Sequence, residues 1–351
     1  MPYSHYWYSF WQLIIVLDET GRVNVDREAI IKEAQDILLL NREEWQPRFN
    51  GYAEKLLANI KEKKHPLYDR QFKEYPPLRF YVSTSNIKNT SSPIFLDVRY
   101  RGQSVATLKT SSKGNTISTK IRDKTNLWDF GCEEKINNDD WNSPRAAKFR
   151  SFFKNRENSR NKTVDNKGNE EHNAESLLLT EFSKQSSTNK QLLNIQPVKL
   201  FGIKFSMPTP LSASHHSKPT KYTKSYRGAI DIFARTGKGG KDTYLTVIEV
   251  KIENNSKVRP QDALKQGMQY AVFIRELLRS EKGQDWYSIF GFKGKLPKKL
   301  KIRVACAMPD DFIDKSFANK KLAIGCDEIE CHYIYFKYNG KRITNIQSSL
   351  G

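Results

Sequence analysis

Apolar residues recur with two different periods in the first half of the chain. After Asp26, apolar residues recur every three to four positions in residues 27–38 and again in about residues 49–63. This spacing places them on one face of a helix. Residues 78–121 instead hold short runs rich in aromatic and β-branched residues, separated by glycines, which predicts several strands. Residues 1–153 are therefore expected to form an N-terminal α+β domain with a recognition, regulatory or assembly role.

A polar segment follows this domain. Residues 154–173 contain a single aliphatic or aromatic residue, Val164, among many charged residues and asparagines. Such a segment cannot bury enough apolar surface to offset the entropy lost on ordering it. It is interpreted as a linker or mobile loop and as the boundary before a second domain, residues 174–351.

The second half predicts an α/β fold. Residues 174–182 and 260–279 have helical spacing, and the second of these begins with a proline and is followed by Gly283. Strands are expected at residues 196–206, 227–235, 244–252, 302–308 and 330–338. This order predicts a mixed sheet flanked by helices, with a hairpin between the second and third strands.

The charge balance narrows the class of partner. Lys and Arg outnumber Asp and Glu by 59 to 39 over 351 residues, so the formal net charge is +20. Residues 201–300 hold 19 Lys and Arg against 8 Asp and Glu, a net of +11, whereas the first fifty residues hold 5 against 8. A basic field concentrated in one region is typical of nucleic-acid binding, although lysines also decorate ordinary solvated surfaces.

Composition also excludes two classes of protein. Four cysteines in 351 residues are too few for a secreted disulfide scaffold. No apolar run is long enough to cross a bilayer, and the N-terminus lacks the basic leader of a signal peptide. These features predict a cytoplasmic protein without a membrane partner.

Three polar residues interrupt the apolar strands of the predicted hairpin. Asp231 lies between two isoleucines, and Glu249 and Lys251 lie on either side of Val250. Residues two apart in a strand project from one face, about 7 Å from each other, and strand pairing would bring Asp231 to the same face. Adjacent carboxylates repel each other, and a hard divalent cation such as Mg²⁺ or Mn²⁺ relieves that repulsion.

The sequence resembles the PD-(D/E)XK nuclease superfamily over roughly residues 171–310, in the two motifs Gly228-x-Ile230-Asp231 and Ile248-Glu249-Val250-Lys251. An isoleucine replaces the proline that usually precedes the aspartate. The resemblance implies a restriction-endonuclease-like core within residues 174–351. In that core Asp231, Glu249 and the Val250 carbonyl would hold Mg²⁺ or Mn²⁺, and Lys251 would position the attacking water.

The two flanking helices supply further candidates through the same resemblance. In this family a glutamate on the first core helix often completes the metal site, so Glu175 is preferred and Glu181 is kept as the alternative. Gln266 and Tyr270 resemble the QxxxY motif of the RecB-like branch and would shape the site. Both lie on an apolar helical stripe, where a glutamine needs a hydrogen-bond partner.

Basic residues flank these acids in the sequence. Lys224, Arg227, Lys257 and Arg259 are expected to contact the phosphate backbone of a nucleic acid. The predicted hairpin tip, residues 237–241, adds two lysines without the spacing of a phosphate-binding loop.

Less specific interpretations stay open. A sheet with one solvated face would also carry Asp231, Glu249 and Lys251, as exposed cross-strand ion pairs of little energetic value. Cys326, Cys331 and His332 would suggest zinc, but no fourth ligand stands at a recognisable spacing, so ordinary strand residues are the simpler interpretation.

The resemblance predicts a Mg²⁺-dependent endonuclease that cleaves DNA in preference to RNA, in restriction, transposition or anti-phage defence. The alternatives are a nucleic-acid-binding protein without catalysis and an assembly subunit that meets an acidic protein partner. A homodimer, or a protein partner bound through the N-terminal domain, is compatible with either class.

Overall fold

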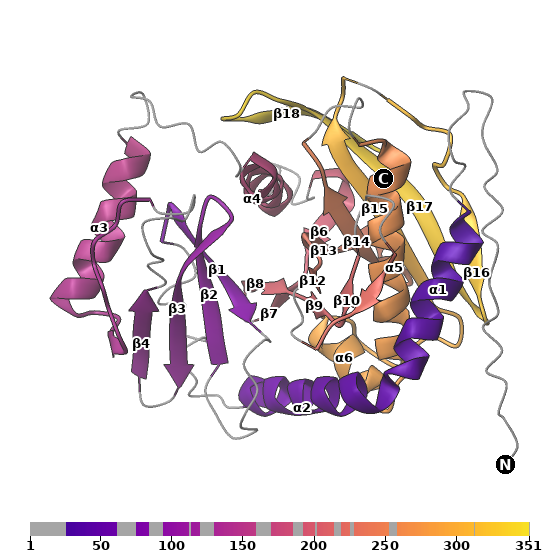
Figure 1. The fold of residues 1–351 in the computed structure, drawn as a ribbon, viewed down its shortest axis with the longest axis horizontal. Coiled ribbons are helices and arrows are strands. Elements are labelled where there is room, and N and C mark those ends of the chain that lie inside the picture. The colour runs from indigo at the N-terminus through magenta and orange to yellow at the C-terminus, as the bar shows by residue number, and fades with distance from the viewer. Residues whose placement is uncertain are drawn as a thin grey trace, which may run out of the picture.

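The computed structural model describes twelve segments of the chain, residues 26–61, 75–83, 94–111, 114–119, 130–158, 170–184, 192–200, 202–213, 219–224, 228–252, 258–311 and 313–350. Two β-sheets lie at opposite ends of the molecule, and helix α4 (Glu170–Ser183) lies between them (Figure 1). The protein is therefore of mixed α/β class, as the pattern of apolar residues predicts.

The first sheet has the strand order β5-β4-β3-β2-β1-β8-β7. The predicted strands over residues 78–121 are present as β1 (Leu78–Ser83), β2 (Ile94–Tyr100), β3 (Gln103–Ser111) and β4 (Gly114–Thr119), and β5 spans Asp139–Asp140. Helix α3 (Pro144–Asn158) packs Phe153 against Tyr100, with ring centroids 4.8 Å apart. The remaining two strands, β7 (Lys199–Leu200) and β8 (Ile203–Ser206), come from much later in the chain.

The second sheet has the order β16-β17-β15-β14-β13-β6, and β18 pairs with β17. Strands β13 (Ile232–Gly239) and β14 (Asp242–Val250) form the predicted antiparallel hairpin, whereas β14, β15 and β17 run parallel. The other members are β6 (Ile195–Pro197), β15 (Lys301–Pro309), β16 (Lys321–Ile324), β17 (Asp327–Tyr338) and β18 (Ile343–Ser348).

Short elements complete the description of the chain. A 3₁₀ turn (Leu192–Asn194) precedes β6, and two small strand pairs form between β9 (Pro208–Thr209) and β12 (Gly228–Ala229) and between β10 (Leu211–Ser212) and β11 (Lys221–Tyr222).

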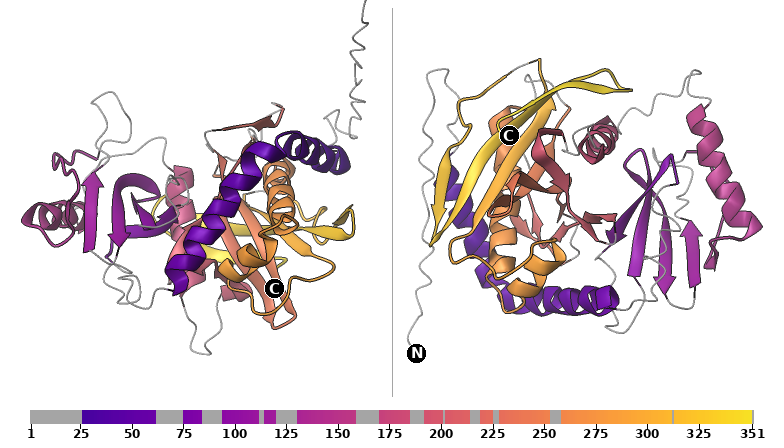
Figure 2. Two further views of the ribbon diagram at one scale, coloured as in Figure 1. Left: turned by 90° about the horizontal axis from the view of Figure 1, so that it is seen from below. Right: turned by 180° about the vertical axis from the view of Figure 1, so that it is seen from behind.

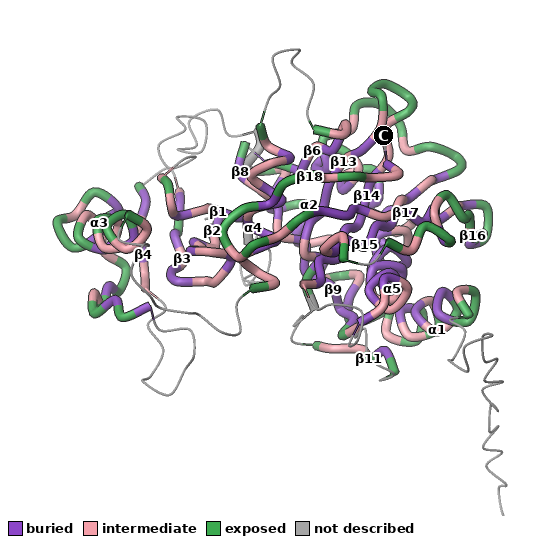
Figure 3. The backbone as a smooth tube through the Cα atoms, turned by 90° about the horizontal axis from the view of Figure 1, so that it is seen from above, coloured by how far each residue is buried: buried purple, intermediate pink, exposed green. Residues whose placement is uncertain are grey.

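Helices cover both faces of the second sheet. Helix α5 (Pro260–Leu278) lies along one face and α4 along the other, each over its own layer of buried apolar residues. Because a strand alternates its side chains, Val247 of β14 faces the α5 layer and Ile248 faces the α4 layer. The strands and α5 form the most continuously buried part of the molecule (Figure 3).

The first two helices pack on α5 and α6 (Gly283–Ile289). Helix α1 (Arg27–Leu40) has the expected N-cap, since the Asp26 carboxylate accepts hydrogen bonds from the main chain of the first turn. Helix α2 (Arg42–Lys61) begins about seven residues before its predicted start and crosses beneath the molecule (Figure 2). Its Trp45 ring meets that of Phe273 in α5 at a centroid distance of 5.8 Å.

The parts of the chain before and after the predicted boundary, residues 154–173, contact each other extensively. Helices α1 and α2 pack on the second half of the chain, and β8 pairs with β1 of the first sheet. The single strand predicted over residues 196–206 is three strands, β6, β7 and β8, and the chain passes from one sheet to the other between β6 and β8. Periodicity fixes an element's exposed and buried faces but not the partner that covers the buried face.

Candidate active site

The β13–β14 hairpin brings Asp231 and Glu249 together. Its antiparallel register pairs Ile232 with Ile248, so one step further Asp231 lies opposite Glu249. The main-chain N–H of Val250 donates to Asp231 Oδ2 at 2.9 Å, which fixes the orientation of this carboxylate.

The acids and the neighbouring lysine are buried. Glu249 is 0% exposed and Lys251 is 4% exposed, whereas Asp231 is half-buried. The interpretation of these residues as exposed cross-strand ion pairs is therefore wrong. Removing charged groups from water costs free energy. An ion pair of the weak kind found on protein surfaces does not offset that cost.

Glu249 lies in a confined space beneath helix α5. A Cβ atom built on Gly267 would approach Glu249 Cγ to 3.3 Å. Among the described residues, no N–H or hydroxyl group donates to either carboxylate oxygen of Glu249, and the one group within hydrogen-bond reach is the Asp231 carboxyl, with which Glu249 can share a proton. Burial raises the pKa of Glu249 well above its ordinary value, and repulsion from Asp231 adds to the effect, while the Lys251 ammonium opposes it.

Lys251 makes two close polar contacts. Its Nζ donates to Glu171 Oε1 at 2.9 Å and to the Val250 carbonyl at 3.0 Å. Burial alone would lower the pKa of Lys251, but the carboxylates of Asp231, Glu249 and Glu171 outweigh it and raise that pKa. The amine therefore stays a charged ammonium, which suits orientation of a water or stabilisation of negative charge and excludes a role as the resting base.

Glu175 reaches the same cluster from α4. It is 3% exposed, with Oε1 3.5 Å from Arg99 Nη1 and Oε2 3.4 Å from His172 Nδ1. The Asp231 pKa is raised mainly by burial, and Glu175 also contributes. Glu181 instead pairs with Lys184 Nζ at 2.6 Å, so the geometry favours Glu175 as the helix acid.

Gln266 and Tyr270 lie one helical turn apart on α5, with 3.5 Å between Gln266 Nε2 and the Tyr270 hydroxyl. The Gln266 Oε1 is buried and has no partner in the described part of the chain. Burial raises the pKa of Tyr270, and Glu249 raises it further. The hydroxyl therefore stays protonated close to the acids and can donate a hydrogen bond there.

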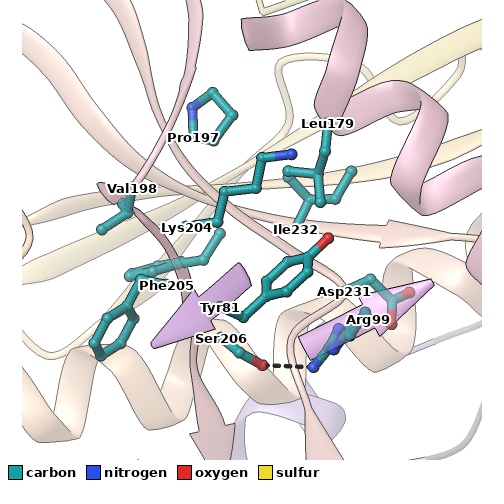
Figure 4. A pocket seen from close by; sticks show the side chains of 11 residues that line it. Tyr81, Arg99, Leu179, Pro197, Val198, Lys204, Phe205, Ser206, Asp231 and Ile232 are labelled. Carbon is teal, nitrogen blue, oxygen red and sulfur yellow. Dashed lines mark hydrogen bonds between the residues drawn. The ribbon is translucent and has the colours of Figure 1, made fainter. Parts of the chain in front are cut away.

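The first sheet contributes residues that no sequence pattern had indicated. Tyr81 of β1, Arg99 of β2 and Lys204 of β8 line a pocket of about 10 Å³, room for about one water, together with Asp231 (Figure 4). The Arg99 guanidinium stacks over the Tyr81 ring at 4.2 Å. The pairing of β1 with β8 places Tyr81 beside Lys204, and that of β1 with β2 adds Arg99, so no local signal could have identified this group.

Two of these groups, the Tyr81 hydroxyl and Lys204 Nζ, are buried without a hydrogen-bond partner in the described residues, and Lys204 Nζ lies 5.9 Å from the Tyr81 ring centroid. Burial lowers the pKa of Lys204 to about 7, and the nearby cations Arg79 and Lys199 add to that effect while Glu175 opposes it. Lys204 therefore loses its proton far more readily than an exposed lysine does, beside the acidic cluster.

The structure describes two of the four basic residues that are expected to contact phosphates. Arg227 and Lys257 lie outside the described residues. Lys224 pairs with Glu44 of α2 at 2.8 Å, and Arg259 pairs with Asp262 at 3.0 Å at the start of α5. Both described cations already have a carboxylate partner, so they offer less free charge than the sequence suggested.

The donor set can be compared with what a metal ion needs. No three His, Cys, Asp or Glu side chains of the described residues are arranged as a metal cage, and this includes Cys326, Cys331 and His332. Mg²⁺, however, commonly binds to one or two carboxylates and completes its shell with waters and substrate phosphates. The oxygens of Glu249, to which no N–H or hydroxyl of the described residues donates, fit such an ion beside Asp231.

A scan against protein-family models and searches of curated proteins and of solved structures found no match for this chain. In the described residues, no helix has the length and apolar character required to span a bilayer.

Proposed function

We propose that the protein is a metal-dependent nuclease that hydrolyses phosphodiester bonds, with DNA as the expected substrate. The observation that carries the proposal is the pair of facing acids, half-buried Asp231 and fully buried Glu249, beside the charged Lys251, with no N–H or hydroxyl donor to either Glu249 oxygen among the described residues. The succession of α4, β6, β13, β14, α5 and β15 supports the expected restriction-endonuclease-like core.

The chain's own residues have distinct roles in this proposal. Asp231 and Glu249 would hold Mg²⁺ or Mn²⁺, with Glu175 and the Val250 carbonyl as further candidate ligands. The bound ion would lower the pKa of a water and neutralise charge on the phosphate. The Lys251 ammonium would orient that water and stabilise the negative charge that develops on the phosphate oxygens. The Tyr270 hydroxyl would donate a hydrogen bond beside Glu249.

The test is cleavage of plasmid and single-stranded DNA by purified protein with Mg²⁺ or Mn²⁺. We expect Asp231→Asn and Lys251→Met each to reduce the rate about 100-fold or more, because each removes an interaction with the reacting groups. Asp36→Asn and Lys148→Met change exposed residues of the same types and should leave the rate unchanged. Cleavage at the original rate in both site variants would overturn the proposal.

One contact favours the non-catalytic alternative. Lys251 Nζ donates to the Val250 carbonyl at 3.0 Å, so a cation ligated by this carbonyl would share the oxygen with a positively charged ammonium and be repelled by it. A protein that binds DNA with a steep salt dependence, but cleaves it with no divalent metal, would be a nucleic-acid-binding module on this fold.

A further inference from the structure

A second basic feature lies at the other end of β14 from the acids. It is a groove of about 680 Å³ between the β13–β14 turn, α6 and the segment 291–302. Among the described residues, its lining includes no aspartate or glutamate and six cationic residues, which are Arg235, Lys241, Lys293, Lys295, Lys299 and Lys301. The hairpin-tip lysine that the sequence singled out therefore lies close to a lysine-rich segment some fifty residues later.

The cations of the groove are not all equivalent. Lys299 and Lys301 approach Glu328 at 3.4 and 3.5 Å, so their charges are partly compensated. Lys241, Lys293 and Lys295 are exposed and make no ion pair with a carboxylate of the described residues. The uncompensated charge of the groove lies with these three lysines and with Arg235.

Arg235 is a half-buried guanidinium with no carboxylate partner in the described part of the chain. Its Nη1 donates to the Gly291 carbonyl at 2.6 Å, and its buried Nε has no hydrogen-bond partner there. A Cβ atom at position 291, where φ is +87°, would lie 2.8 Å from Nη1, so only glycine allows this approach. A bound anion would supply the partner that the buried Nε lacks and would compensate the charge of this half-buried guanidinium.

Aromatic rings stand among the cations. Tyr287 and Phe292 line the groove, are half-buried and stack on each other, with centroids 4.4 Å apart and an interplanar angle of 12°. Arg235 lies 6.0 Å from the Phe292 ring centroid. Cations that follow a backbone beside rings that can accept bases are typical of nucleic-acid grooves, whereas an acidic peptide would need the charges alone.

We propose that this groove binds the phosphate backbone of a nucleic acid outside the catalytic centre. The inference deepens the proposed nuclease function by giving the substrate a second contact. Thr243 of the groove and Glu249 are six residues apart along β14, which corresponds to about 20 Å. That span equals roughly six nucleotides of duplex, so the groove would hold DNA or RNA that extends beyond the cleavage point.

The test measures binding without catalysis, in EDTA, by fluorescence anisotropy of labelled duplex DNA, single-stranded DNA and RNA of about 30 nucleotides. Lys293→Gln/Lys295→Gln removes two groove charges, and the matched control Lys148→Gln/Lys154→Gln removes two exposed charges from α3. The groove variant should bind duplex DNA at least about fivefold more weakly at moderate salt. Its slope of log K against log salt should fall by about 1.8, or by about 1.4 for a single strand.

An affinity and a salt slope equal to those of the control variant would overturn the proposal. Competition by polyglutamate as strong as that by DNA, at equal charge concentration, would overturn it in favour of an acidic protein partner. The nucleic acid with the highest affinity among duplex DNA, single-stranded DNA and RNA identifies the ligand that the groove prefers. Because binding is measured without metal, a groove effect in a protein that never cleaves leaves this inference standing and rejects only the nuclease proposal.

Discussion

At the scale of single residues, Glu249 and Lys204 carry ionisable groups that the fold buries but does not satisfy. Among the described residues, no N–H or hydroxyl group donates to either Glu249 oxygen, and Lys204 Nζ lacks a hydrogen-bond partner. Each such group lowers the stability of the native state, because a buried polar group without a partner loses its hydration. Groups of this kind cluster at sites that bind or react, where stability is given up for function.

Lys204→Met is expected to raise the free energy of unfolding by about 1–3 kcal/mol near pH 6. The native pKa of Lys204 is lowered from 10.5 to about 7, so between these values the unfolded state binds more protons than the native state. Wild-type stability therefore rises with pH across this window, and the advantage of the methionine variant should shrink as pH approaches 10. Urea unfolding at several pH values, in EDTA, measures this.

A gain in stability that is the same at pH 6 and pH 10 would contradict this account of Lys204. The exposed Lys148→Met, on helix α3 and not among the charges that act on Lys204, is the matched control and should change stability little at either pH.

At the scale of elements, the packing of α5 on β14 sets the position of Glu249. Gly267 of α5 faces Glu249, and a methyl group there would lie 3.3 Å from Glu249 Cγ. Gly267→Ala improves the helix propensity by up to about 1 kcal/mol, but it pushes the carboxylate from its place. We expect little net change in stability and about a tenfold loss of metal-dependent cleavage, measured as initial rates.

Gly51→Ala in α2 is the control for that experiment, because a Cβ there meets nothing within 4 Å. It should gain a similar helix propensity and retain full cleavage activity. Equal activity in the two alanine variants would show that α5 does not position Glu249.

Elements with strong local signals could be predicted from the sequence. The β13–β14 hairpin, α5 and α1 each combine clear periodicity with a turn or cap, such as Asp26 before α1 and Pro260 at the start of α5. The predicted start of α2 was wrong. Trp45, near the observed beginning of this helix, packs on Phe273 of a distant helix. Tertiary contacts of this kind leave no trace in a local pattern.

At the scale of the whole molecule, the two halves share their packing. Asp231, Glu249 and Lys251 could be proposed from one hairpin, since they lie within about twenty residues of each other. Tyr81 and Lys204 are more than a hundred residues apart and meet only through the pairing of β1 with β8. The part of the pocket that the first sheet contributes could therefore not be predicted from local sequence.

Trp45→Ala tests whether the halves unfold together. The side chain is buried between α2 and α5 and its Nε1 donates to the Leu38 carbonyl at 2.8 Å. Its loss should lower the free energy of unfolding by about 3–5 kcal/mol. If the packing is continuous, probes in both sheets should show the same shifted midpoint in urea. Two separate transitions, with only one shifted, would instead support independent domains at residues 154–173.

Arg99 links the first sheet to the acidic cluster. It belongs to a strand of the first sheet, yet its guanidinium lies 3.5 Å from Glu175 of the acidic cluster and hydrogen-bonds Ser206 at 3.1 Å. Any tilt of one sheet against the other would withdraw or advance a positive charge at the acids. Because Arg99 also pairs with Asp97 of its own strand at 2.7 Å, this ion pair would move as a unit and change the electric field at Glu175.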